Sequence, residues 1–215
     1  SFMHSLIVKS QLLFTTDPSI NDIYHEIQRL GDYDRQIQLF KSAAAVTGSF
    51  YKAQKWAYVR EDLDYASLYL LYAATSLAQI EVGFAREIIS REVIPQALDL
   101  NPEFFRIVYT DLLNKKKTKK EVKQAIKAID AYLSDKAMTV FKLLLDHLEA
   151  EGDVRSASDL DHHFNRAYGT GSVVMACEYL SDLGIIDKVS TPAKLTTRSQ
   201  VNVEEMAFFY TGEDY

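Results

Sequence analysis

Two aspartates and a Gly-Ser pair have the residue types needed to transfer a phosphate-bearing group. Gly48-Ser49 could form a turn around phosphates, and Asp62 and Asp64 could hold two divalent metals that align a hydroxyl with a triphosphate. This chemistry requires both aspartates to point the same way from a strand. The residues after Asp64 instead have the 3.6-residue period of a helix, as do residues 40–47 before Gly48. We therefore predict that Asp62 caps a helix, that Gly48 marks a kink, and that this chain contains no catalytic or metal-binding residue.

A second group of residues combines cations with aromatic rings at helical spacing. It consists of Lys52, Lys55, Trp56, Tyr58 and Tyr65. These side chains could face another domain, or they could stack on a nucleotide or on an acceptor base. The alternative is that Trp56 and Tyr65 belong to the core while the lysines are solvated. These five residues are the candidate substrate- or nucleotide-binding site.

A run of lysines is the candidate contact with nucleic acid. The chain has a net charge of −6, yet residues 106–127 hold 8 basic and 2 acidic side chains. Such a run could neutralise the phosphates of tRNA or of another nucleic acid. A solvated loop and helix start is the alternative, because no aromatic residue interleaves the run. The candidate residues are Lys115, Lys116, Lys117, Lys119 and Lys120.

The C-terminal part has a helix-turn-helix pattern with unfavourable charge for DNA. Residues 134–215 hold 7 basic and 14 acidic side chains, and Arg166 is the one basic residue between Ser156 and Leu183. Because phosphate neutralisation supplies most non-specific DNA affinity, contact with a protein is favoured over contact with DNA. His162-His163 is interpreted as a solvated pair, and Cys177 as a small core residue. A single cysteine excludes a disulfide framework and suits the cytoplasm.

The order of capping and apolar residues predicts a mainly α fold with two units. Helices are expected from Asp17, Asp32 and Asp62, around 93–98 and 105–112, and from Thr118. After Ser134, helices ending at Gly152 and beginning at Ser156 and Ser172 are expected to precede two short strands, Ile185-Ile186 and Lys194–Thr196, with Pro192 in the turn. No run of 18 apolar residues predicts a membrane helix.

Several ordered blocks carry a resemblance to a known family. The blocks are 52–71, Ala78–Val82, Arg91–Leu98 and Asn101–Phe105, together with Leu12–Asp17. They resemble the helical segment that lies behind the catalytic domain in prokaryotic nucleotidyltransferase-like proteins of the polymerase-β-type superfamily. The resemblance covers residues 5–115. It implies that the catalytic Gly-Ser turn and metal-binding carboxylates of the family would lie before residue 1.

The expected fold is thus an antiparallel helical bundle (17–133) and a winged helix-turn-helix (134–215), after a strand remnant or linker (1–16). The expected function is that of the accessory, substrate-binding portion of a nucleotidyltransferase-like protein. The resemblance implies Mg²⁺ and a nucleoside triphosphate for the complete enzyme, and no cofactor in this chain. The alternative is a free-standing winged-helix regulator with a dimerising or ligand-sensing bundle. Expected partners are the missing nucleotidyltransferase domain, another protein, or a second copy paired through residues 5–14.

Overall fold

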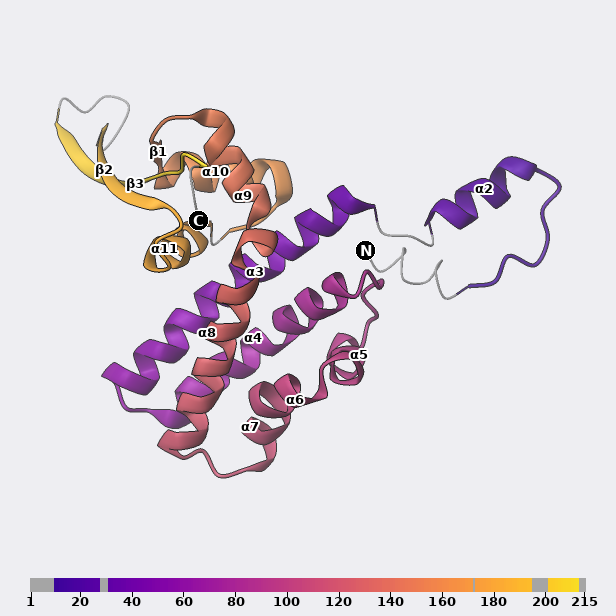
Figure 1. Cartoon of the computed structure of the whole chain (residues 1–215), viewed down its shortest axis with the longest axis horizontal. Helices are drawn as coiled ribbons and strands as arrows, with labels where there is room; N and C mark the ends of the chain where they lie inside the picture. Colours follow the sequence, from indigo (N-terminus) through magenta and orange to yellow (C-terminus); the bar gives the residue numbers. More distant parts are fainter. Residues whose placement is uncertain (1–9, 28–30, 172, 195–200, 213–215) are drawn as a thin grey trace.

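The chain is mostly helical and ends in a small antiparallel sheet, as Figure 1 shows. The structure, a computed structural model, describes residues 10–27, 31–171, 173–194 and 201–212. The mainly α fold class predicted from the sequence is confirmed. Within the described residues, no helix combines the length and the apolar character needed to cross a membrane.

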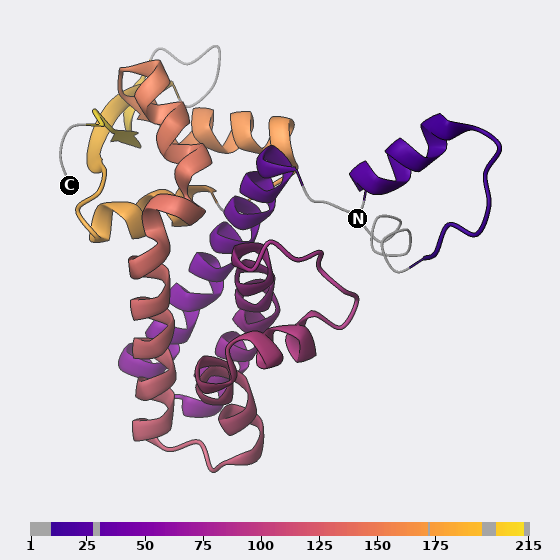
Figure 2. The same ribbon diagram turned by 45° about the vertical axis from the view of Figure 1, so that its right-hand side comes forward.

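Three long helices form the body of the molecule. They are α3 (Asp32–Gln54), α4 (Leu63–Phe84) and α8 (Lys119–Val140), and each contacts the other two (Figure 2). Their shared core holds large side chains with no exposed surface, among them Phe40, Leu77 and Leu133. At Gly83 an added Cβ would lie 2.9 Å from Leu39 Cδ2, so a larger residue there would require the Leu39 side chain to shift.

The turn between α3 and α4 confirms the predicted cap. The Asp62 carboxylate accepts a hydrogen bond of 2.9 Å from the backbone N–H of Tyr65, as expected of an N-cap residue. α3 continues unbroken through Gly48, where a kink was expected. The helix departs from α geometry later, in the π-helical turn η1 (Lys55–Val59).

Short helices cover α4 and α8 on one side. They are α5 (Val93–Leu100), α6 (Pro102–Phe105), the π-helical turn η2 (Arg106–Thr110) and α7 (Asp111–Asn114). The Asn101 side chain caps α6, and Pro102 occupies the first turn, where its missing N–H costs no hydrogen bond. Phe105 is fully buried and anchors this segment to the core.

α8 continues past Ser134, the position at which the change in charge suggested a boundary. The Ser134 hydroxyl donates to the carbonyl of Ala131 at 3.1 Å, so it is satisfied within the helix. The helical path breaks instead at Phe141, which joins α8 to α9 (Lys142–Glu151). Gly152 then ends α9 with a φ of 63°, as its type predicted.

Two further helices and three strands complete the C-terminal part. They are β1 (Arg155–Ser156), α10 (Ala157–Tyr168), α11 (Val173–Asp182), β2 (Asp187–Lys194) and β3 (Asn202–Phe209). The sheet order is β1-β3-β2, with both neighbouring pairs antiparallel. Ser156 caps α10 by accepting from the N–H of Asp159 at 3.1 Å, as predicted. The predicted cap at Ser172 lies outside the described residues.

One of the two predicted strands is wrong, and Pro192 does not lie in a turn. Ile185-Ile186 lies in a bend, and Pro192 belongs to β2, where it lies opposite Glu204. Because β2 is at the edge of the sheet, a proline that cannot donate a backbone hydrogen bond is tolerated there. Of the predicted strand Lys194–Thr196, Lys194 ends β2, and the other two residues lie outside the described part.

The N-terminal residues carry one separate helix, α2 (Pro18–Ile27), which has no buried residue (Figure 1). Asp17 caps it through a 2.9 Å bond from the N–H of Ser19. Ile20 and Ile23 of this helix are both exposed. Residues 10–14 form no strand, and the remainder of the predicted strand segment 5–14 lies outside the described residues.

Candidate functional site

The predicted group of cations and aromatics lies at the α3–α4 turn. Lys52 and Lys55 are exposed, Trp56 packs in part against the core, and Tyr58 and Tyr65 are 45% and 39% exposed. Trp56 and Tyr65 are in contact, with ring centroids 4.5 Å apart. The Tyr58 ring is not part of this contact and instead faces the Lys123 ammonium of α8.

Tyr65 begins an aromatic strip along α4. Tyr69 and Tyr72 follow it at helical spacing, and successive ring centroids lie 5.3 and 5.8 Å apart in edge-to-face contact. Tyr72 is 60% exposed. We call Trp56, Tyr65, Tyr69 and Tyr72 the tyrosine strip. The sequence prediction included neither Tyr69 nor Tyr72 in this group, although their spacing of four and three residues was a readable signal.

A lysine from α3 connects to this strip. The Lys52 ammonium lies 5.3 Å from the centre of the Tyr69 ring, within cation–π distance. The Tyr69 hydroxyl raises the pKa of Tyr65 by hydrogen bonding, so Tyr65 remains neutral at physiological pH. The strip therefore presents aromatic rings with one cation held among them.

Lys52 also borders a hollow of about 460 Å³ between α3 and α11. Gly48 and Ser49 line it from α3, Lys55 from η1 and Met175 from α11. None of its lining residues carries a carboxylate, whereas two carry ammonium groups. Gly48-Ser49 thus belongs to a helical wall and not to the phosphate-binding turn that its residue types first suggested. The hollow favours an anion by charge alone.

α11 forms the other wall and is packed on both sides. Each residue from Val173 to Ser181 is buried or partly buried. The Tyr179 hydroxyl donates to the carbonyl oxygen of Asp130 at 3.2 Å, and its ring lies edge-on to Phe50. The Tyr51 hydroxyl donates to Asp182 at 2.5 Å. α11 is therefore held against the bundle by aromatic and polar contacts.

The lysine run lies at the same end of the bundle as the α3–α4 turn. Lys115 pairs with Asp111 at 2.7 Å, and Lys119 pairs with Glu61 at 2.9 Å. Lys116 and Lys120 are exposed, and no ion pair joins either to another described residue, while Lys117 is partly buried. The run thus keeps part of its charge unneutralised.

One contact joins this end of α8 to an aromatic residue of the predicted group of cations and aromatics. The Lys123 ammonium lies 5.5 Å from the centre of the Tyr58 ring. Together with the Lys119–Glu61 pair, it brings the two predicted groups to one end of the bundle.

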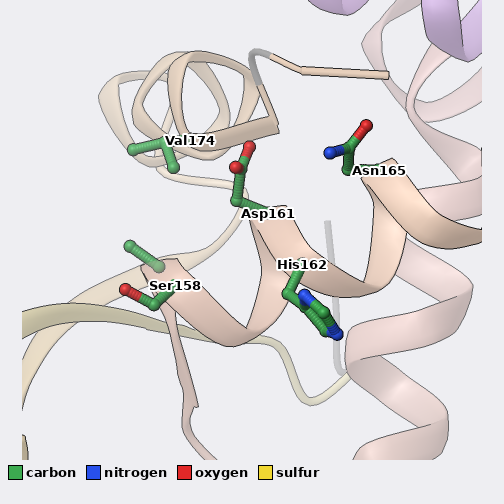
Figure 3. A pocket seen from close by; sticks show the side chains of 6 residues that line it. Ser158, Asp161, His162, Asn165 and Val174 are labelled. Atoms are coloured by element: carbon green, nitrogen blue, oxygen red, sulfur yellow. The ribbon is translucent and has the colours of Figure 1, made fainter. Parts of the chain in front are cut away.

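A second hollow of about 360 Å³ lies between α10 and α11 (Figure 3). Ser158, Asp161 and His162 line it, and these are residue types used in nucleophilic catalysis. The side chains of Asp161 and His162 point in different directions in Figure 3, and no hydrogen bond joins any two of the three. The hollow therefore lacks the hydrogen-bonded relay that activates a serine.

The remaining reactive residues have structural surroundings. His163 stacks on His147 of α9 with ring centroids 4.1 Å apart. Burial lowers the pKa of His147, and His163 and Arg155 lower it further. Burial raises the pKa of the Cys177 thiol, so this side chain is a core residue as predicted. Within the described part of the chain, no group of three or more His, Cys, Asp or Glu residues could hold a metal ion.

Comparison with known proteins identifies one similar fold. No family model matches the sequence, and no curated protein matches it. The crystal structure of a nucleotidyltransferase-like protein from Exiguobacterium sibiricum 255-15 aligns with a TM-score of 0.69 and 14% sequence identity. The alignment covers 97% of this chain and 70% of that chain. The chain therefore shares a nucleotidyltransferase-like fold, and the expected similarity is confirmed at this level.

Proposed function

We propose that this chain is the substrate-binding, accessory portion of a nucleotidyltransferase-like protein. In this proposal a substrate is held by the tyrosine strip together with Lys52 and Lys55, which we call the α3–α4 face. The transfer would move a nucleotidyl group from a nucleoside triphosphate to an acceptor. The shared fold supports the family, because nearly the whole chain aligns while part of the similar protein has no counterpart here. The observation that carries the role is the combination of unpaired lysines and exposed rings on one face.

The aspartates of this chain do not fit the Mg²⁺ that such a transfer requires. The Asp62 carboxylate already caps α4, and Asp64 lies in the first turn of the same helix. Residues two apart at a helix start do not face each other, so the two carboxylates cannot converge on a pair of metals. We therefore place the metal-binding and catalytic residues of the proposed reaction outside this chain.

An exposed apolar arm supports the presence of a further domain. Leu13 and Phe14 are 87% and 81% exposed, and Ile20 and Ile23 on α2 are exposed as well. Exposed large apolar side chains gathered in one segment are typical of an interface. We propose that the nucleotidyltransferase domain covers it, with a homodimer as the alternative. Light scattering on the chain as it stands distinguishes these, because a homodimer doubles the measured mass.

We propose that α9, α10, α11 and the sheet form a winged helix-turn-helix that contacts protein and not duplex DNA. A helix that reads a groove must present an exposed face. In α11, Asp182 is the one exposed residue, and its carboxylate accepts from Tyr51 of α3. The burial of α11 and the acidic charge of this part disfavour the alternative of a DNA-binding regulator.

The test is incorporation of label from α-labelled nucleoside triphosphates with Mg²⁺, comparing this chain with a longer polypeptide that joins it to a nucleotidyltransferase domain. We expect incorporation by the longer polypeptide and none by the chain alone. Incorporation by the chain alone that disappears in Asp62→Asn or Asp64→Asn would overturn the proposal.

A further inference from the structure

The α3–α4 face is free of negative charge over most of its length. From Arg35 to Arg60 the sequence has five basic and no acidic residues, and from Tyr65 to Ile80 it has no charged residue of either sign. In a chain with a net charge of −6, this composition is a local exception. The scarcity of negative charge on this face favours the approach of anions.

Three of the carboxylates near this face, those of Asp182, Glu178 and Asp62, are already engaged. Asp182 accepts from Tyr51, and Glu178 pairs with Lys188 at 2.7 Å. Asp62 caps α4. Lys52 and Lys55 have no carboxylate partner among the described residues, so their charge is available to a ligand.

The face combines exposed rings with a cation held among them, an arrangement that suits a nucleic acid strand. Lys52 covers the ring of Tyr69, while Tyr65 and Tyr72 on either side of it are exposed. Exposed rings offer faces on which bases stack, and an ammonium between them meets the phosphate that links the nucleosides. Lys55 and the hollow next to α11 extend the cationic surface for the adjoining phosphates.

We propose that the tyrosine strip and the Lys52–Lys55 hollow bind single-stranded nucleic acid, which is the acceptor class for the transfer. Only the role of the strand as acceptor rests on the proposed function, and the binding itself does not. A strand is favoured over a single nucleotide, because the two exposed rings, Tyr65 and Tyr72, are separated by the Tyr69 ring and offer stacking faces to more than one base. It is favoured over a duplex, because paired bases keep their faces stacked on each other and cannot reach the tyrosines.

The test is fluorescence anisotropy of the full chain with end-labelled oligoadenylate RNA and oligothymidylate DNA of about 10 nucleotides. We expect binding to both single strands that weakens steeply between about 50 and 200 mM salt, and weaker binding to a duplex. Tyr72→Leu is expected to weaken binding at least about fivefold, because one stacked base is lost. Lys52→Gln is expected to reduce the magnitude of the salt slope by about 1.

Two matched variants control for non-specific effects. Tyr33→Leu removes a tyrosine that is also 60% exposed but lies outside the strip, and Lys142→Gln removes a lysine of α9. Both are expected to bind as the wild type does. Equal loss in Tyr33→Leu and Tyr72→Leu, or duplex binding as tight as single-strand binding, would overturn the proposal.

The outcome separates this inference from the proposed function. If no oligonucleotide binds while the longer polypeptide still transfers a nucleotidyl group to another acceptor, the acceptor class is refuted and the accessory role stands. If oligonucleotides bind as described but no transfer occurs, the binding surface stands and the proposed function fails.

Discussion

Replacing Tyr179 tests whether α11 is packed against the bundle. Its side chain is 3% exposed and lies edge-on to Phe50, with ring centroids 6.1 Å apart. Its hydroxyl donates to the carbonyl and the carboxylate of Asp130, at 3.2 Å in each case. The residue therefore joins α11, α3 and α8 through one side chain.

The two halves of this side chain predict different losses in the free energy of unfolding. Tyr179→Ala is expected to cost about 3–5 kcal/mol, the usual range for removing a buried aromatic ring. Tyr179→Phe retains the ring and is expected to cost about 1 kcal/mol, since it removes only the hydrogen bond. Asp130 is an exposed residue, so its oxygens regain water and the cost stays near that lower figure.

Urea unfolding followed by circular dichroism measures both losses, with Tyr33→Ala as the control. Tyr33 is 60% exposed, so its replacement is expected to cost less than about 0.5 kcal/mol. A loss below about 1 kcal/mol in Tyr179→Ala would refute the packing of α11, and with it the reason for excluding groove contact by this helix.

Three further predictions concern single groups. Asp62→Ala is expected to lower the free energy of unfolding by about 1 kcal/mol in urea titrations, because it removes the α4 cap. Unchanged stability together with a loss of Mg²⁺ binding would contradict the capping role of Asp62. Because the pKa of His147 in the folded protein lies below the ordinary 6.5, the stability linked to it is present above pH 6.5 and falls by a few tenths of a kcal/mol as the pH drops through the folded pKa. His147→Gln should flatten this part of the plot of unfolding free energy against pH, and an unchanged plot would contradict the lowered pKa. Burial and an acidic partner, Asp182 for Tyr51 and Glu81 for Tyr132, raise the pKa values of these two tyrosines above 10.0, so the free energy of unfolding should fall above pH 10. Ultraviolet titration should show both tyrosines ionising late, and Tyr132→Phe should lower the number of late-ionising tyrosines by one.

The helices could be predicted because their signals are local. Asp62, Ser156 and Gly152 begin or end helices through contacts within four residues, and apolar spacing marks the packed faces. α8 was predicted too short because the change in charge near Ser134 suggested a boundary there, whereas the Ser134 hydroxyl is satisfied within a continuous helix.

The strands could not be placed because pairing depends on distant residues. β1 and β3 are joined through Arg155 and Phe208, far apart in the sequence. The run 202–209 carries a strand signal that was missed, whereas Pro192 was read as a turn because its edge position is not visible in the sequence.

The candidate site was found in part for a similar reason. Lys52, Lys55 and Tyr65 could be named from residue type, but the exposure of Tyr72 depends on which side of α4 is covered. The contribution of Met175 depends on α11 lying against α3. Such tertiary contacts determine which face of a helix is free to bind.

The most direct test of the central claim is nucleotidyl transfer by the longer polypeptide in which Lys52 and Lys55 are both changed to glutamine. With acceptor below saturation, we expect transfer to fall about tenfold, equivalent to about 1.4 kcal/mol of lost binding, while the maximal rate with saturating acceptor is retained. Lys142→Gln, outside the face, should leave transfer unchanged. Equal transfer by the wild type and the double variant at low acceptor concentration would contradict the claim that the α3–α4 face holds the substrate.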